Sequence, residues 1–236
     1  MQNNKTNFED YSSGRVIYGA PGATNFSVRL VSSMFERCKE YLEKVGNAGP
    51  YTLYDSFCGS GYSLSVLGFL YNKDIKNIFA SDFDKHILEF ADKNLALLSH
   101  KGISKRVSEL DKFVKEYGKD SHKEAIKSAE TISSQIKHEI DVKIFHFDVL
   151  NKKLLPKHIK NIDMVIVDIP YGKLTRWQGE SADPSQEFLN KIKPYMGKQS
   201  IVAISANKKQ TVSFKGYNKI GSLKVPKRKV LFLVPN

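Results

Sequence analysis

The sequence predicts an α/β fold, a doubly wound sheet covered by helices, with a helical insertion between two of its strands. Three observations predict it. Short apolar runs typical of buried strands alternate with segments of helical periodicity. Several of the strand runs stop at an acidic residue. Residues 100–140 carry no strand signal, although helical spacing recurs there. A chain of 236 residues is long enough to bury the core of one domain spanning 1–236.

The individual elements follow from the spacing of apolar residues. The predicted strands occupy residues 15–18, 51–54, 78–80, 143–147, 164–167 and 200–205, followed by a terminal antiparallel hairpin within 216–234. The predicted helices occupy residues 26–45, 64–70, 87–98 and 188–195. Apolar residues within 110–117 and 125–136 also have helical spacing, so we expect a two-helix insertion at 100–140.

A glycine-containing turn follows the strand at 51–54. Its sequence is Asp55-Ser56-Phe57-Cys58-Gly59-Ser60-Gly61, and an apolar helical pattern comes next. Glycines at a strand-to-helix turn take positive φ and let a ligand approach the backbone. About 20 residues after this turn, the next strand ends at Asp82, the spacing at which an acid meets the ribose of an adenosine cofactor. We therefore predict these cofactor-binding residues: Asp55, Cys58, Gly59, Gly61, Asp82 and Asp148.

Two of these residues have particular roles in the prediction. Asp148 ends the third strand and suits the adenine edge. Cys58 lies inside the glycine turn, where a small residue is needed, so we interpret it as a packing residue rather than a nucleophile or metal ligand. A solvated strand end explains any one of the acids, but an ordered set of four strand-ending carboxylates favours a functional site.

The fourth of these carboxylates, Asp168, follows the apolar run 164–167 and precedes Ile169-Pro170-Tyr171. Pro170 cannot donate to a sheet ladder, so the strand must end there. A planar base stacked on Tyr171 would donate N–H groups to Asp168 and to a nearby carbonyl. The segment resembles the catalytic motif of S-adenosylmethionine-dependent amino methyltransferases, and we predict Asp168, Pro170 and Tyr171 as catalytic residues.

Charge is unevenly distributed along the chain. Residues 151–236 hold 17 lysines and arginines against 5 acidic residues, whereas residues 1–150 hold 20 of each. Such asymmetry indicates a polyanionic partner, although a lysine-rich solvated surface accounts for part of it. The predicted RNA-binding residues are Lys173, Arg176, Trp177, Lys208, Lys209, Lys227, Arg228 and Lys229. The insertion holds nine basic and seven acidic residues within 101–140, so we do not expect it to be the main RNA anchor.

Several classes of protein are disfavoured. No apolar stretch approaches a membrane span, and the first residues have no hydrophobic targeting core, so we expect a cytoplasmic protein. Two cysteines do not make a disulfide framework, and the six histidines lack metal-ligand spacing, so we expect no metal. A nicotinamide oxidoreductase is disfavoured because the glycine turn lacks the third glycine.

The motifs together resemble the avilamycin-resistance 23S rRNA guanine methyltransferase family. The resemblance rests on the segments 19–22, 50–53, 58–62, 93–99 and 168–172, with Thr175, Trp177 and Gly179. It implies a Rossmann-like seven-stranded methyltransferase sheet and a monomeric enzyme that uses S-adenosylmethionine to methylate a guanine of large-subunit rRNA. The family favours ring N1 as the acceptor, whereas the Asp-X-Pro-Tyr motif alone favours the exocyclic N2 amine.

The sequence leaves several alternative interpretations of the function open. The protein either confers resistance to a ribosome-targeting antibiotic or is a housekeeping relative. A methyltransferase acting on another RNA, DNA or protein is the alternative function, and a catalytically dead cofactor-binding module is disfavoured by the intact motif at Asp168. The insertion either contacts RNA or packs as a hairpin against the edge of the sheet.

Overall fold

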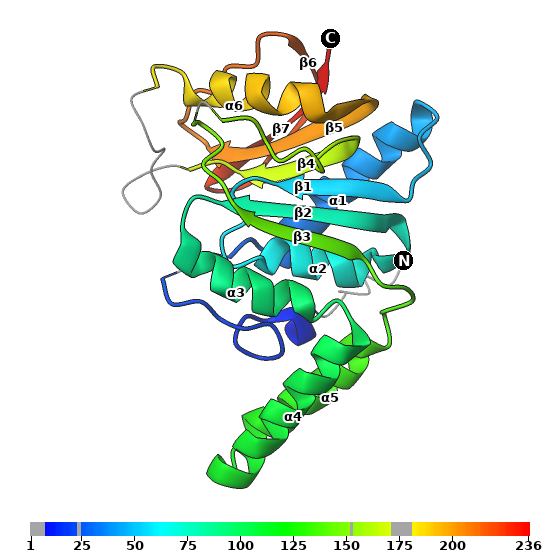
Figure 1. Ribbon diagram of the computed structural model, residues 1–236, viewed down its shortest axis with the longest axis vertical. Helices are drawn as coiled ribbons and strands as arrows, with labels where there is room; N and C mark the ends of the chain where they lie inside the picture. The colour runs from blue at the N-terminus through cyan, green and yellow to red at the C-terminus, as the bar shows by residue number, and fades with distance from the viewer. Residues whose placement is uncertain (1–7, 23–24, 152, 171–180) are drawn as a thin grey trace.

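The computed structural model describes residues 8–22, 25–151, 153–170 and 181–236. Its centre is one seven-stranded sheet with the strand order β3-β2-β1-β4-β5-β7-β6 (Figure 1). The strands are β1 (Tyr51–Asp55), β2 (Ile75–Asp82), β3 (Asp141–His146), β4 (Ile162–Asp168), β5 (Met196–Asn207), β6 (Tyr217–Lys224) and β7 (Arg228–Pro235). The helices are α1 (Val28–Lys44), α2 (Tyr62–Leu70), α3 (Lys85–Ala96), α4 (His100–Tyr117), α5 (Asp120–Ser133) and α6 (Pro184–Ile192). The described residues also form three 3₁₀ turns, Glu9–Tyr11, Asn72–Asp74 and Lys193–Tyr195.

The sheet is parallel except at one edge. The strands β1 to β5 pair in parallel, β7 runs antiparallel to β5, and β6 runs antiparallel to β7. The predicted α/β class and the terminal hairpin are therefore confirmed. Because β1 lies between β2 and β4, the chain leaves β1 toward one side of the sheet and later returns to its other side. The carboxyl end of β1 is thus the topological switch point, where ligands of open α/β sheets bind.

The two faces of the sheet are buried in separate cores. Strand residues alternate between the faces, as their two-residue period requires: Met164 and Ile166 of β4 pack with α1, α2 and α3, whereas Val165 and Val167 pack with α6. Because β4 is covered on both faces, its sequence reads as a continuous apolar run rather than as an alternating one. That burial holds the end of β4 at a fixed position.

The predicted strand at 15–18 is wrong. These residues form turns and bends, although Val16 and Ile17 are fully buried. Side chains satisfy the backbone here instead of a neighbouring strand: Arg106 Nε donates to Val16 O at 3.0 Å, and Asn94 Oδ1 accepts from Tyr18 N at 2.7 Å. Apolar residues therefore mark burial at this segment but not strand pairing.

The helices α4 and α5 form an antiparallel pair that extends away from the sheet (Figure 1). Its base is anchored by Arg106, which is only 6% exposed and whose guanidinium carbon lies 4.1 Å from the centre of the Tyr18 ring. Tyr18 Oη also donates to Glu109 Oε2 at 2.7 Å. The N-terminal segment thus fastens the base of the hairpin to the rest of the protein. Among the described residues, no helix is long and apolar enough to cross a membrane.

Candidate active site

Four predicted carboxylates lie in a row at the carboxyl edge of the sheet. Asp55, Asp82 and Asp168 are the last residues of β1, β2 and β4, and Asp148 follows β3 by two residues. The strand order therefore sets the sequence Asp148, Asp82, Asp55, Asp168 along this edge. Neighbouring strands are about 4.8 Å apart, so adjacent members of the row are within reach of one ligand.

The glycine turn after β1 is held against the end of β2 by hydrogen bonds. Gly59 and Gly61 have φ of +52° and +71°, the left-handed region that glycine adopts without strain. Gly59 N donates to Asp82 Oδ2 at 2.9 Å, and Cys58 N donates to Ser81 O at 3.1 Å. A Cβ on Gly61 would make tight contacts of 3.1–3.3 Å with α3, whereas a Cβ on Gly59 would meet no atom within 4 Å. The backbone at Gly59 is thus open to an approaching ligand.

Asn94 of α3 also holds this turn, and the sequence reasoning gave it no role. It is fully buried, and its Nδ2 donates to Ser60 O at 2.9 Å and to Tyr18 O at 3.0 Å. One amide therefore connects the glycine turn to the N-terminal segment. An asparagine on the apolar face of a predicted helix was the available signal, because such a residue must satisfy its hydrogen bonds internally.

Burial perturbs the carboxyl groups at the centre of the row. Asp55 is 5% exposed, and burial raises its pKa to about 8, with the charges of Asp82 and Asp168 adding to the shift. Burial also raises the pKa of Asp82, against which the backbone N–H groups of Asp84 and Gly59 act. Perturbed carboxyl groups in a ligand-accessible edge favour a functional site. Burial likewise raises the pKa of the Cys58 thiol, which disfavours a nucleophilic role for it.

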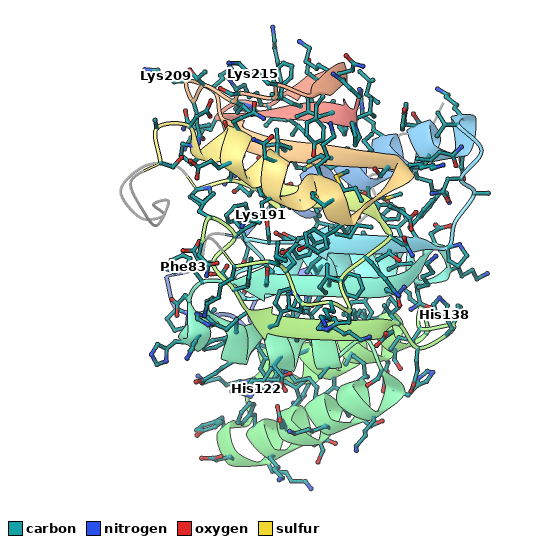
Figure 2. All side chains as sticks on the ribbon, turned by 45° about the horizontal axis from the view of Figure 1, so that its top comes forward. Phe83, His122, His138, Lys191, Lys209 and Lys215 are labelled. Atoms are coloured by element: carbon teal, nitrogen blue, oxygen red, sulfur yellow. The ribbon has the colours of Figure 1, made fainter. Side chains whose placement is uncertain are left out.

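The outer end of the row is formed by Asp148 and by an aromatic residue that the sequence reasoning missed. Phe147 N donates to Asp82 O at 3.0 Å, which brings the segment holding Asp148 against the end of β2. Phe83, directly after Asp82, is 42% exposed, and its carbonyl lies 2.7 Å from His146 Nε2. Figure 2 shows Phe83 projecting from this edge. An exposed aromatic ring beside a strand-ending acid is suited to stack on a planar ligand.

Asp168 at the other end of the row is held on one side only. Arg228 Nη1 donates to Asp168 Oδ2, whereas Asp168 Oδ1 is buried without a hydrogen-bond partner among the described residues. The following backbone is fixed too: Ile169 N donates to Ser205 O at 3.0 Å, and Gln210 Nε2 donates to Pro170 O at 3.0 Å. One carboxylate oxygen of Asp168 is therefore left without a partner by the described residues.

Some predicted site residues lie outside the described residues. Tyr171, Lys173, Arg176 and Trp177 belong to this group. The remaining lysines of the predicted RNA-binding set differ in their exposure. Lys208, Lys209 and Lys227 are exposed where β5 ends and β7 begins, with Lys208 N donating to Lys227 O at 3.3 Å, and Lys229 is half-buried. Lys209 projects on the same side as Phe83 (Figure 2).

Arg228 is placed differently from the predicted phosphate contact. Its side chain is 15% exposed, pairs with Asp168, and lies with its guanidinium carbon 5.1 Å from the centre of the Phe26 ring. The neighbouring Lys227 is exposed instead. Lys227 lies in the bend before β7, whereas Arg228 is the first residue of the strand and its side chain is paired with Asp168. We therefore separate Arg228 from the exposed lysines.

The charged groups of the site do not form a metal centre. Among the described residues, no group of three or more histidine, cysteine, aspartate or glutamate side chains is arranged to hold a metal ion. The row instead combines single carboxylates on separate strands with a glycine turn. Such an arrangement suits a nucleoside-containing ligand with several hydroxyl and amino donors.

Comparisons with known proteins agree with this geometry. A sequence-family model described as rRNA methyltransferase AviRa matches residues 1–228. The 23S rRNA (guanine(2535)-N(1))-methyltransferase of Streptomyces viridochromogenes is 34% identical over 202 residues, which cover 83% of this chain and 80% of that protein. A solved structure of rRNA methyltransferase aviRa from the same organism has a TM-score of 0.85 and 30% identity, covering 95% of this chain and 91% of that one. TrmN from Thermus thermophilus shares the fold, with a TM-score of 0.54 at 14% identity over 89% of this chain and 49% of that one.

Proposed function

Because the chain belongs to the rRNA methyltransferase AviRa family, we propose that it transfers a methyl group from S-adenosylmethionine to ring N1 of a guanine in 23S rRNA. The observation that carries the proposal is the row of carboxylates at the switch point, which ends in a buried, unused oxygen of Asp168. The relative named above acts on guanine N1, which favours this nitrogen over the N2 amine.

The described residues fit the cofactor. Asp82 would accept hydrogen bonds from the ribose hydroxyls, since each of its oxygens keeps a second acceptor position beside the one used by the backbone. Ser56 Oγ, next to Asp55, is buried without a hydrogen-bond partner among the described residues, so it has a donor and acceptor to offer. Gly59 leaves room for close backbone approach. The cofactor supplies an electrophilic methyl group on a positively charged sulfonium.

Asp168 would act on the guanine. Methylation at N1 requires loss of the N1 proton, and Asp168 Oδ1, which has no hydrogen-bond partner among the described residues, would accept that proton as the N1 lone pair takes up the methyl group. Burial raises the pKa of Asp168, with Arg228 opposing the shift, so its carboxylate is a stronger base than an exposed one. The Pro170 carbonyl, held by Gln210, is a second acceptor for the base edge. Tyr171 would stack on the base, a role that rests on the sequence alone.

RNA would be held by the basic half of the chain. The exposed Lys208, Lys209 and Lys227 at the end of β5 adjoin the strand that bears Asp168, since Asp168 pairs with Ser205 of β5. Phosphate contacts of this kind position RNA without reading its sequence. Lys173, Arg176 and Trp177 follow the catalytic motif and stay in the proposed RNA-binding set on sequence grounds.

The proposal is tested with purified enzyme and labelled S-adenosylmethionine. Methyl transfer is measured on naked 23S rRNA, large subunits, small subunits and transfer RNA, and the product nucleoside is identified by mass spectrometry. We expect 1-methylguanosine in 23S rRNA and no product from Asp168→Asn, which keeps the shape of the side chain but removes the proton acceptor. Methylation of another substrate class, or 2-methylguanosine as the product, would contradict the proposal.

A further inference from the structure

Arg228 connects three separated segments at the candidate site. Its Nη1 donates to Asp168 Oδ2 of β4 and lies 3.5 Å from Ser205 Oγ of β5, and its guanidinium carbon lies 5.1 Å from the centre of the Phe26 ring before α1. The register supports this placement, because Arg228 opens β7 and pairs with Asn207, two residues beyond Ser205. A guanidinium stacked on a ring and bonded to a carboxylate is held in one orientation.

This contact makes the two oxygens of the Asp168 carboxylate unequal. Arg228 occupies Oδ2, and Oδ1 is buried without a hydrogen-bond partner among the described residues. A buried acceptor left unpaired costs free energy, which a ligand donor at Oδ1 would recover. A carboxylate bound at one oxygen also loses rotational freedom about its Cβ–Cγ bond, so the position of the other oxygen is defined.

We propose that Arg228 is a positioning residue for methyl transfer, which holds Asp168 through Oδ2 and reserves Oδ1 for the N1–H of the target guanine. The inference rests on the proposed function. In this arrangement, Arg228 keeps Asp168 ionised before the base arrives, and its charge stays fixed while the proton moves from N1 to Oδ1. It contacts neither cofactor nor base, and acts through Asp168.

Burial and the groups around Asp168 shift its pKa in opposite directions. Burial raises the pKa of Asp168, and Arg228 is the charged group that lowers it, helped by the Ser205 hydroxyl. Asp55 ends the adjacent strand β1, and the charge of Asp168 contributes to the raised pKa of Asp55. Loss of the guanidinium would leave burial opposed only by the Ser205 hydroxyl, which favours the protonated form of Asp168.

The test is the pH dependence of single-turnover methyl transfer by Arg228→Met, Arg228→Gln and Arg228→Lys. For the Met and Gln variants, we expect the acidic midpoint of the rate to move up by about one pH unit, the lower end of the effect of a nearby opposite charge. At pH values below both midpoints, the saturated rate falls about tenfold for such a shift, and the KM for 23S rRNA is unchanged. Arg228→Lys restores the midpoint because it keeps the charge. Thermal unfolding identifies variants that fail to fold, and Gln keeps a hydrogen-bond donor should Met be unstable.

The matched control is Arg37→Met. The guanidinium of Arg37 in α1 lies 5.9 Å from the ring centre of Phe232, a residue of β7. This variant therefore removes a similar arginine–aromatic contact that does not involve Asp168. We expect its pH profile to equal that of the parent. A lower rate with an unmoved midpoint in the Met and Gln variants would overturn the inference. So would a raised KM for 23S rRNA with an unchanged pH profile, which would make Arg228 a phosphate contact.

The two proposals fail in distinguishable ways. If the parent protein methylates no 23S rRNA, the proposed function fails and the inference falls with it. If the parent is active and the Arg228 variants keep the parental midpoint, the inference alone is wrong.

Discussion

Alanine substitutions at the two glycines of the site turn should separate stability from ligand binding. Both glycines have positive φ, so each alanine would cost about 1–2 kcal/mol from the left-handed backbone alone. At Gly61 the new Cβ would lie 3.1 Å from Ala91 Cα and 3.3 Å from Leu95 Cγ, so α3 must give way by a few tenths of an ångström. Overpacking of this kind costs a further 1–3 kcal/mol or so, about 2–5 kcal/mol in all. At Gly59 no atom lies within 4 Å of the new Cβ, so only the backbone cost applies.

For cofactor binding, we expect the larger effect at Gly59, where the loss of stability is smaller. The open space at Gly59 is where we expect the cofactor, so Gly59→Ala should weaken binding of S-adenosylmethionine at least about tenfold, or about 1.4 kcal/mol. Urea unfolding gives the stabilities, and isothermal titration calorimetry gives the affinities. An equal loss of stability in the two variants would refute the packing argument. A Gly59→Ala protein that binds the cofactor like the parent would show that the ligand does not approach this turn.

Three further predictions concern charged groups. Asp82→Ala should weaken S-adenosylmethionine binding by about 1.5–3 kcal/mol in calorimetry, since it removes charge-assisted hydrogen bonds, and an unchanged affinity would refute the ribose assignment. Burial raises the pKa of Asp55 to about 8, whereas an aspartate in the unfolded chain releases its proton near pH 4. Between these pH values the folded protein binds one proton more than the unfolded chain, so the contribution of Asp55 to stability should fall as pH rises from about 4 to 8. Urea unfolding at several pH values should therefore show Asp55→Asn gaining on the parent by up to about 1.4 kcal/mol per pH unit, and a constant difference would contradict the shift. Arg106→Met should lower the unfolding free energy by about 2–4 kcal/mol, because one buried and one partly buried backbone carbonyl lose their donor, and a loss below about 0.5 kcal/mol would show that water replaces the guanidinium.

The elements and the edge of the site follow from local features of the chain. Apolar runs gave β1, β2, β4 and β5, since strands buried on both faces lack polar alternation. The acids ending three of these strands predicted a shared edge before any pairing was known, because parallel strands present their carboxyl ends together. The strand predicted at 15–18 was wrong because apolar residues indicate burial, not strand pairing. The backbone of this segment is instead hydrogen-bonded to the side chains of Arg106 and Asn94.

The sequence by itself therefore determined the α/β class, the glycine turn and the four carboxylates, since each depends on residues close together in the chain. Only the tertiary structure decided which partners those carboxylates have. Arg228 reads as one of several basic residues in a lysine-rich tail, yet it lies 60 residues from Asp168 in sequence and contacts it in space. That contact depends on the insertion of β7 beside β5 and on its register, which places Arg228 opposite Asn207. Long-range pairing of this kind is fixed by packing of the whole sheet, so no local pattern reports it.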